Sequence, residues 1–381
     1  MALSRAVGDP DVFAAELWTR RAQHRLALGG EGFDDLLSLD DVDLLVSSAG
    51  LRLPAFRLVK DGGTLPVARY TKTTRTGSNE ATGVLDSRAV YDEFGAGASI
   101  VFQGMHRYWA PLAEYCRLLE VALGHPVQAN AYITPPGAQG FGAHEDEHDV
   151  FVLQSHGTKT WKVHERHDLP PTMPPVIEAD ISPGDSLYIP AGFPHSASTQ
   201  TKESVHITIG ILTLTWASVM TEAVRAVESD PALDQPLPLR FAVEDGAFTR
   251  QVAEHLRLMG ASVAGVDPED VTRSLRRKVF TTRQSVLRGQ IRRLLAIDRV
   301  SDESIVRRRE GSICIIDLVD EEVSALLGDR ELRMPVLAGP AITLVATGEA
   351  IRVGDLPGLD ENGRIVLARR LIREGLLEVV D

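Results

Sequence analysis

Residues 127–215 carry the pattern that most restricts how this chain can fold. Short runs rich in β-branched and aromatic residues are separated there by glycine and proline, and no helical pattern of about 12 residues lies between consecutive runs. The runs are Ala129–Ile133, Asp149–Gln154, Lys159–His164, Ser186–Ile189 and Val205–Thr213. Parallel strands need long crossovers, which are usually helical. The spacing therefore predicts an antiparallel sandwich or barrel and argues against a βαβ fold.

Helical patterns lie on both sides of this β-rich segment. Apolar residues recur at helical spacing within 11–60 and 108–123 before it, and within 216–227, 247–259 and 268–297 after it. Residues 301–381 mix short strands with a helix over 364–374, and the polar, Thr-rich stretch 71–83 is typical of an exposed loop. The sequence thus predicts an α+β chain with three parts, residues 1–215, 216–300 and 301–381.

Composition narrows the class of protein. The chain has 381 residues and a formal net charge of -13, which argues against a whole surface built for nucleic acid. Two cysteines, Cys116 and Cys314, exclude a disulfide framework and a zinc site made of cysteines. The first residues lack the apolar core of a secretory signal, and the stretch 206–220 is too short and too polar to span a bilayer. We therefore expect a cytoplasmic protein.

Histidines gather in and beside the β-rich segment, where nine of the 11 lie between His106 and His206. Two histidines and one carboxylate can hold a metal on one face and leave its other positions open. In a strand, residues i and i+2 point the same way, so a His-x-Asp pair can reach one ion. Among the nine, His144 alone has a carboxylate, Asp146, at that spacing. Glu147 is a rival carboxylate, but its spacing from His144 suits a helix better than a strand.

A second histidine ligand is predicted from residues 184–199. They contain a glycine, a strand, the corner Pro190-Ala191-Gly192 and then His195. This order resembles the second cupin motif, in which the corner directs the histidine into the mouth of a barrel, except that Thr199 replaces the final asparagine. A core histidine at a turn is the alternative. The full spacing together with the upstream His144 and Asp146 favours a metal ligand.

The stretch from Asn130 to Asp146, followed by 149–154 and 159–163, resembles the Jumonji-C ribosomal oxygenases. These are cupin-fold, Fe(II)- and 2-oxoglutarate-dependent protein hydroxylases. The resemblance is dense over 127–212. It implies a double-stranded β-helix (cupin, or jelly-roll) catalytic domain, a helical dimerisation region and a winged-helix-like C-terminal domain. It also implies that iron is bound by His144, Asp146 and His195, with 2-oxoglutarate and O2 as co-substrates and an arginine or histidine of a ribosomal protein as the target.

Three further residues take roles from the same resemblance. Lys159 would pair with the distal carboxylate of 2-oxoglutarate, although the bare sequence also allows a solvent-facing lysine on a strand. Asn130 and Tyr132 lie two apart and so share one face of a strand. They are candidates for hydrogen bonds to the co-substrate, and packing and strand register are their alternative roles.

A basic segment lies downstream. Residues 271–310 contain 12 Lys and Arg against four acids, which leaves a charge of -21 on the rest of the chain. The arginines could pack along a dimer seam, which we favour slightly, or contact RNA or an acidic partner. Phe280 is the only interleaved aromatic residue, which weakens the case for single-stranded RNA.

Three hypotheses about function follow. The first is hydroxylation of a ribosomal-protein side chain by a homodimer. The second is the same chemistry on a peptide natural product or small molecule. The third, from another class, is a non-catalytic cupin scaffold that binds nucleic acid through its basic helix. An intact set of metal ligands argues against the third.

Overall fold

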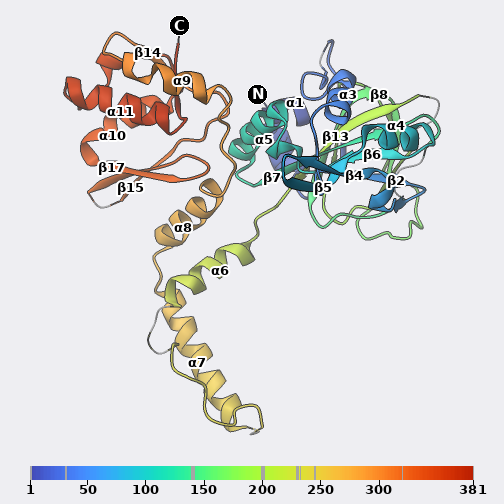
Figure 1. The fold of residues 1–381 in the computed structure, drawn as a ribbon. Coiled ribbons are helices and arrows are strands. Elements are labelled where there is room, and N and C mark those ends of the chain that lie inside the picture. The colour runs from blue at the N-terminus through green and yellow to red at the C-terminus, as the bar shows by residue number, and fades with distance from the viewer. Residues whose placement is uncertain are drawn as a thin grey trace. The chain divides into compact units, whose positions relative to one another are not determined.

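The computed structural model describes residues 2–30, 32–138, 142–198, 202–228, 231, 233–243, 246–319 and 321–380. The chain divides into two compact units, Met1–Thr213 and Leu214–Asp381 (Figure 1). Within the described residues, no helix combines the length and the apolar character needed to cross a membrane.

The first unit is built on two antiparallel sheets, as the spacing of the runs predicts. The larger has the strand order β1-β11-β8-β13-β7-β6-β2-β3, and the smaller has the order β10-β9-β12. Strands of the larger sheet are β1 (Gln23–Arg25), β2 (Phe56–Lys60), β3 (Gly63–Thr64), β6 (Ser99–Phe102), β7 (Val127–Thr134), β8 (Asp149–Gly157), β11 (Ser186–Ile189) and β13 (Ser204–Ile211). Those of the smaller are β9 (Lys159–Val163), β10 (Ile177–Ile181) and β12 (His195–Ser198).

Alternation along β7 separates the core from the site. Ala129, Ala131 and Ile133 are buried in the main hydrophobic core, while Asn130 and Tyr132 line a cavity on the opposite face. A strand presents successive side chains to opposite faces, so one strand serves both purposes.

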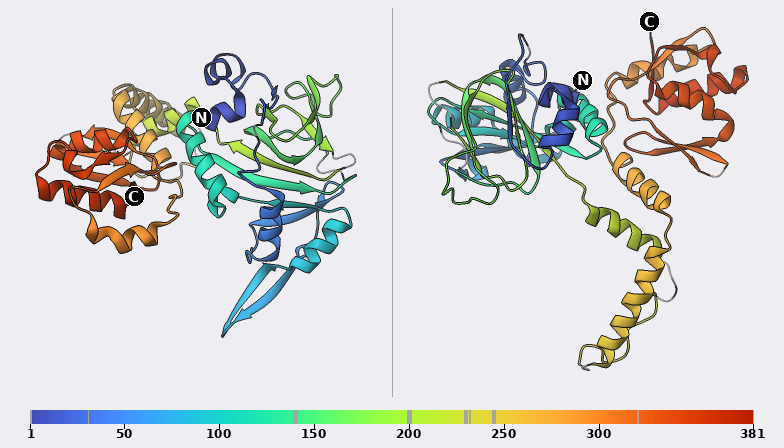
Figure 2. Two further views of the ribbon diagram at one scale, coloured as in Figure 1. Left: turned by 90° about the horizontal axis from the view of Figure 1, so that it is seen from above. Right: turned by 180° about the vertical axis from the view of Figure 1, so that it is seen from behind.

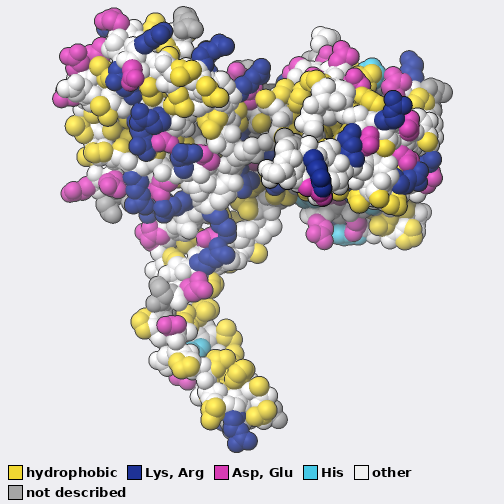
Figure 3. Space-filling view, in the orientation of Figure 1, with side chains coloured by type: hydrophobic (Ala, Val, Ile, Leu, Met, Phe, Trp, Pro, Cys, Tyr) yellow, Lys and Arg dark blue, Asp and Glu magenta, His cyan; other side chains and the backbone are white. Residues whose placement is uncertain are grey.

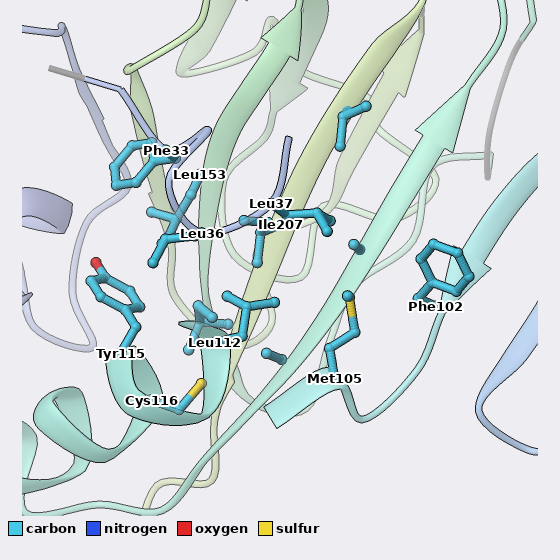
Figure 4. Packing of buried hydrophobic residues seen from close by; sticks show 14 of the residues in the cluster. Phe33, Leu36, Leu37, Phe102, Met105, Leu112, Tyr115, Cys116, Leu153 and Ile207 are labelled. Atoms are coloured by element: carbon cyan, nitrogen blue, oxygen red, sulfur yellow. The ribbon is translucent and has the colours of Figure 1, made fainter. Parts of the chain in front are cut away.

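Helices cover the core face of the larger sheet. Those that contribute buried residues to the core are α1 (Ala2–Val7), α3 (Leu39–Ser47), α4 (Ser87–Gly95) and α5 (Ala110–Leu123), whereas the short α2 (Pro10–Val12) contributes none. A capping box between Ser38 and Asp41 begins α3, and Gly124 ends α5 in the left-handed conformation at φ 69°. Leu112 and Cys116 of α5 belong to the same hydrophobic core as Ile207 of β13, and Figure 4 shows all three among its packed side chains.

Residues 71–83 are exposed, as expected, but the prediction of a loop is wrong. They form most of a two-stranded hairpin of β4 (Thr71–Thr76) and β5 (Asn79–Leu85), which projects from the first unit in Figure 2. Threonine suits a strand, but an exposed ribbon lacks the apolar alternation that reveals a half-buried strand.

The second unit combines helices with two small sheets. The helices are α6 (Trp216–Val227), α7 (Ala247–Ala264), α8 (Pro268–Phe280), α9 (Gln290–Ala296), α10 (Gly339–Ala346) and α11 (Glu361–Arg373). The sheets are β18-β14-β19 and β15-β16-β17, formed by β14 (Ile305–Arg308), β15 (Ile315–Val319), β16 (Glu322–Leu326), β17 (Glu331–Pro335), β18 (Ile351–Arg352) and β19 (Leu377–Val379). The helix expected over 268–297 is interrupted at 281–289. Val279 and Phe280, at the end of α8, pack there against Ile313 and Leu326.

Candidate metal centre

The three predicted metal ligands meet in the first unit. His144, Asp146 and His195 each place one ligand atom within 4.8 Å of the others, and they form the one such His/Asp/Glu/Cys group found in the described part of the chain. His195 Nε2 lies 3.7 Å from Asp146 Oδ2. The rival Glu147 is exposed and lies outside this group.

Backbone pairing brings the two ligand-bearing segments together. The His144 amide donates to His195 O at 3.1 Å, and the His195 amide donates to His144 O at 2.8 Å. His195 begins β12, whereas His144 makes an isolated bridge outside any named strand. The His-x-Asp spacing predicts a strand at His144, and this local prediction is wrong. In the structure, this single bridged pair positions the two imidazoles.

The hydrogen bonds of both imidazoles leave the same nitrogen for a metal. His144 Nδ1 lies 2.9 Å from Gly142 O, and His195 Nδ1 lies 3.0 Å from Phe193 O. A carbonyl oxygen can only accept, so each Nδ1 carries the hydrogen and each Nε2 keeps its lone pair. Burial, followed by the charge of His144, lowers the pKa of His195, which favours the neutral form that binds metals. The donor set and its tautomers therefore fit a divalent transition metal.

A cavity of about 270 Å³ opens beside these ligands. Its walls come from both sheets of the first unit and include the three ligands together with Lys159, Asn130 and Tyr132. The structure therefore brings all six predicted site residues to one cavity.

Lys159 is buried in this cavity at 3% exposure, so the alternative of a solvent-facing strand lysine is wrong. Its Nζ donates to Thr134 Oγ1 at 3.2 Å. Burial lowers the pKa of the Lys159 ammonium from 10.5 to about 8, and no nearby carboxylate contributes to that shift. A buried cation without a counter-charge among the described residues fits an anionic ligand.

Asn130 and Tyr132 combine contacts to the protein with exposure to the cavity. Asn130 Oδ1 accepts from the Gly104 amide at 2.9 Å, which supports a structural role. Tyr132 stacks on His206 with ring centroids 5.0 Å apart. Burial raises the pKa of the Tyr132 phenol, and the neighbouring Arg57 partly offsets this. The phenol therefore stays protonated near neutral pH.

The comparisons with known proteins agree with this geometry. Residues 109–219 match the family model described as the JmjC domain. Ribosomal oxygenase 1 of Rattus norvegicus is 26% identical over 91% of this chain and 54% of the rat protein. A bifunctional lysine-specific demethylase and histidyl-hydroxylase, NO66 of Drosophila simulans, is 31% identical over 42% of this chain and 22% of its own length. The chain therefore contains a JmjC domain and is similar to ribosomal oxygenases over most of its length.

Solved structures support the fold along the whole chain. A ribosomal oxygenase of Escherichia coli, YcfD, in complex with cobalt and 2-oxoglutarate matches with a TM-score of 0.58, 17% identity and 99% of both chains. Its complex with cobalt and succinic acid matches with a TM-score of 0.60 and 18% identity. At this identity the likeness shows the fold alone. The chain spans about half the length of the rat relative.

Several further residues, which the sequence patterns did not identify, line the cavity. Thr134 follows Asn130 and Tyr132 at the same alternation, so the strand pattern held the signal for it. Arg57 comes from β2, which reaches β7 through β6, and nothing local in the sequence marks it. His206 is buried and also lines the cavity, so core and site roles coincide there. Thr199 and residues 139–141 of the quoted motifs lie outside the described residues.

Proposed function

We propose that this chain is an Fe(II)- and 2-oxoglutarate-dependent oxygenase that hydroxylates a side chain of a ribosomal protein. The observation that carries the proposal is the joint presence, in one cavity, of a His-Asp-His ligand set and a buried lysine. The names of the relatives supply the substrate class, and histidine is favoured over arginine by the hydroxylase relative. Iron is proposed because this ligand set with open positions is typical of non-haem iron oxygenases.

The chain's own residues would divide the work as follows. His144, Asp146 and His195 would hold the metal, and their backbone hydrogen bonds keep each Nε2 available. Lys159 would bind the distal carboxylate of 2-oxoglutarate, which fixes the co-substrate's orientation. Iron, once bound, supplies the oxidative chemistry that couples decarboxylation of 2-oxoglutarate to hydroxylation of a C–H bond. The walls of the cavity would exclude water from that reaction.

Parts of the proposal concern the second unit. We infer a helical dimerisation region over 216–300 and a winged-helix-like domain over 301–381. Support for self-association comes from α7, which contains no buried residue, and from an apolar groove of about 350 Å³ that Phe248, Val252 and Leu256 help to line. Apolar side chains gather over this helix in Figure 3. A cytoplasmic location stays a prediction.

RNA contact through 271–310 also stays a prediction, and the ion pairs weaken it. Six of the segment's cations pair with carboxylates outside the segment: Arg273, Arg276, Arg277, Lys278, Arg293 and Arg307. About half of the predicted positive charge is therefore compensated within the second unit, which leaves less for phosphates.

The direct test is an anaerobic titration with Fe(II) and then 2-oxoglutarate, followed by assays of succinate release with peptides from ribosomal proteins. We expect metal-dependent binding of 2-oxoglutarate and turnover on a histidine-containing peptide. His144→Ala, Asp146→Ala and His195→Ala should each abolish turnover, because each removes one of three protein ligands. Glu147→Ala is the matched control and should retain it.

Three outcomes would each contradict a part of the assignment. Absence of any metal-dependent binding of 2-oxoglutarate would rule out the oxygenase. Turnover retained in Asp146→Ala would identify Glu147 as the carboxylate ligand. Turnover on small molecules with none on peptides would favour the alternative substrate class.

A further inference from the structure

Two separate segments of the chain carry the metal ligands. His144 and Asp146 lie on one, and His195 follows the corner 190–192 on the other. Besides the paired amides of His144 and His195, the Gly192 amide donates to Asp146 O at 2.9 Å. The spacing between the ligands therefore depends on how firmly these two segments are joined.

Asp149 joins the same two segments through its side chain. It lies three residues beyond Asp146, begins β8 and is 2% exposed. Its Oδ1 accepts from the Ala191 amide at 2.7 Å, within the corner that precedes His195. Its Oδ2 accepts from the Tyr188 hydroxyl at 2.8 Å. Both carboxylate oxygens are therefore used, and hydrogen bonds to a charged acceptor are stronger than neutral ones.

Tyr188 extends this connection to the beginning of the chain. Its hydroxyl oxygen accepts from the Thr19 amide at 2.8 Å. Its ring packs against Phe13 with centroids 4.8 Å apart, and it is 1% exposed. Burial, followed by the charge of Asp149, raises the pKa of Tyr188, so the hydroxyl remains a donor at all relevant pH. The tyrosine thereby orients the carboxylate toward Ala191.

We propose that Asp149 is a positioning residue for the metal centre, acting through the Ala191 amide to fix the distance between the Asp146 and His195 segments. The inference rests on the proposed function only in assuming that the three ligands bind a metal. Residues that hold metal ligands in place without touching the metal commonly support its affinity. Removing one of them typically weakens metal binding by about 10- to 100-fold. If the Asp149 carboxylate only stabilised the fold, its removal would lower the melting temperature and leave the metal affinity unchanged.

The test measures the Kd for Co(II) by its visible absorption in the full-length chain, together with the melting temperature of the metal-free protein. Asp149→Ala should raise the Kd about 10-fold or more. Ser186→Ala is the matched control. Its hydroxyl is also buried on β11 and donates to Ala6 O at 2.6 Å, but it touches neither ligand segment. It should lower the melting temperature and leave the Kd unchanged.

Asp149→Asn serves if the alanine variant does not fold. The asparagine side chain keeps one oxygen that can accept from the Ala191 amide, but this neutral oxygen makes a weaker hydrogen bond than a carboxylate. The Kd for Co(II) should therefore rise less than in Asp149→Ala and more than in Ser186→Ala. A Kd equal to that of Ser186→Ala, in whichever Asp149 variant folds, would overturn the positioning role and leave the proposed function intact. A wild-type chain that binds no Co(II) would overturn the proposed function, and this inference with it.

Discussion

Lys159 has an unusual environment for a lysine, because it is buried and donates to the neutral Thr134 Oγ1. Burial lowers its pKa from 10.5 to about 8. Between these two values the unfolded chain binds more protons than the folded one, so this lysine makes the free energy of unfolding rise with pH across that window. A bound dianion would act in the opposite direction and stabilise the charged ammonium.

The affinity for 2-oxoglutarate should therefore fall as the pH rises above about 8, by up to about tenfold per pH unit, because binding must then include uptake of a proton. Calorimetry of the Co(II)-loaded, anaerobic protein between about pH 7 and pH 9.5 measures this. Lys159→Arg is the control, since a guanidinium stays charged over the range and should abolish the pH dependence. A wild-type affinity that stays constant across the range would show that the co-substrate does not use Lys159.

The turn between β8 and β9 passes the chain from the larger sheet to the smaller one, and it leads directly into Lys159. Gly157 adopts φ 62° there, and a Cβ at this position would lie 1.8 Å from Glu203 O. Backbone packs against backbone, so no side chain can move aside to make room. The glycine is required both by its conformation and by this close approach.

An alanine forced only into the left-handed conformation lowers the free energy of unfolding by about 1 kcal/mol. Gly157→Ala should lower it by about 2 kcal/mol more, because its methyl group also meets the backbone at Glu203. Gly50→Ala is the matched control, because Gly50 also has φ 62° and no atom lies within 4 Å of the position that a Cβ would take there. Denaturant unfolding of both variants gives the comparison. Equal losses would mean that the backbone at Glu203 yields to the methyl group.

At the scale of the whole molecule, the positive charge of the basic segment is less available, and the apolar surface of α7 more exposed, than composition alone indicates. The basic segment 271–310 is partly neutralised by acids elsewhere in the second unit, among them Glu222 and Glu378. The apolar surface of α7, by contrast, has no partner among the described residues that buries it. We therefore propose self-association, and not RNA binding, as the role of the helical region.

We expect the chain to be a dimer at micromolar concentration and Leu256→Glu to shift it toward monomer, because Leu256 is 63% exposed and lines the apolar groove on α7. Light scattering after size-exclusion chromatography measures the mass. Ala261→Glu adds the same charge to an exposed position of α7 outside the groove and should leave the dimer intact. A wild-type monomer would remove the dimerisation role of α7.

The sequence by itself determined the antiparallel β-rich core and identified the three candidate metal ligands, whose roles stay a prediction. Strand alternation and the spacing around Pro190 and Gly192 are local patterns. The structure has strands in this region and brings His144, Asp146 and His195 together, as these patterns predict. The same alternation placed Asn130 and Tyr132 on the cavity face. Local patterns were less informative for the hairpin at 71–83, where exposure removes the apolar signal that marks a strand.

The tertiary structure alone decided the surroundings of those ligands. It buried Lys159, brought Arg57 to the cavity from a distant strand and placed Asp149 against Ala191. These contacts join residues that lie tens of positions apart, so no local spacing encodes them. A lysine on a strand can face either water or a cavity, and only the packing of two sheets settles which environment sets its pKa.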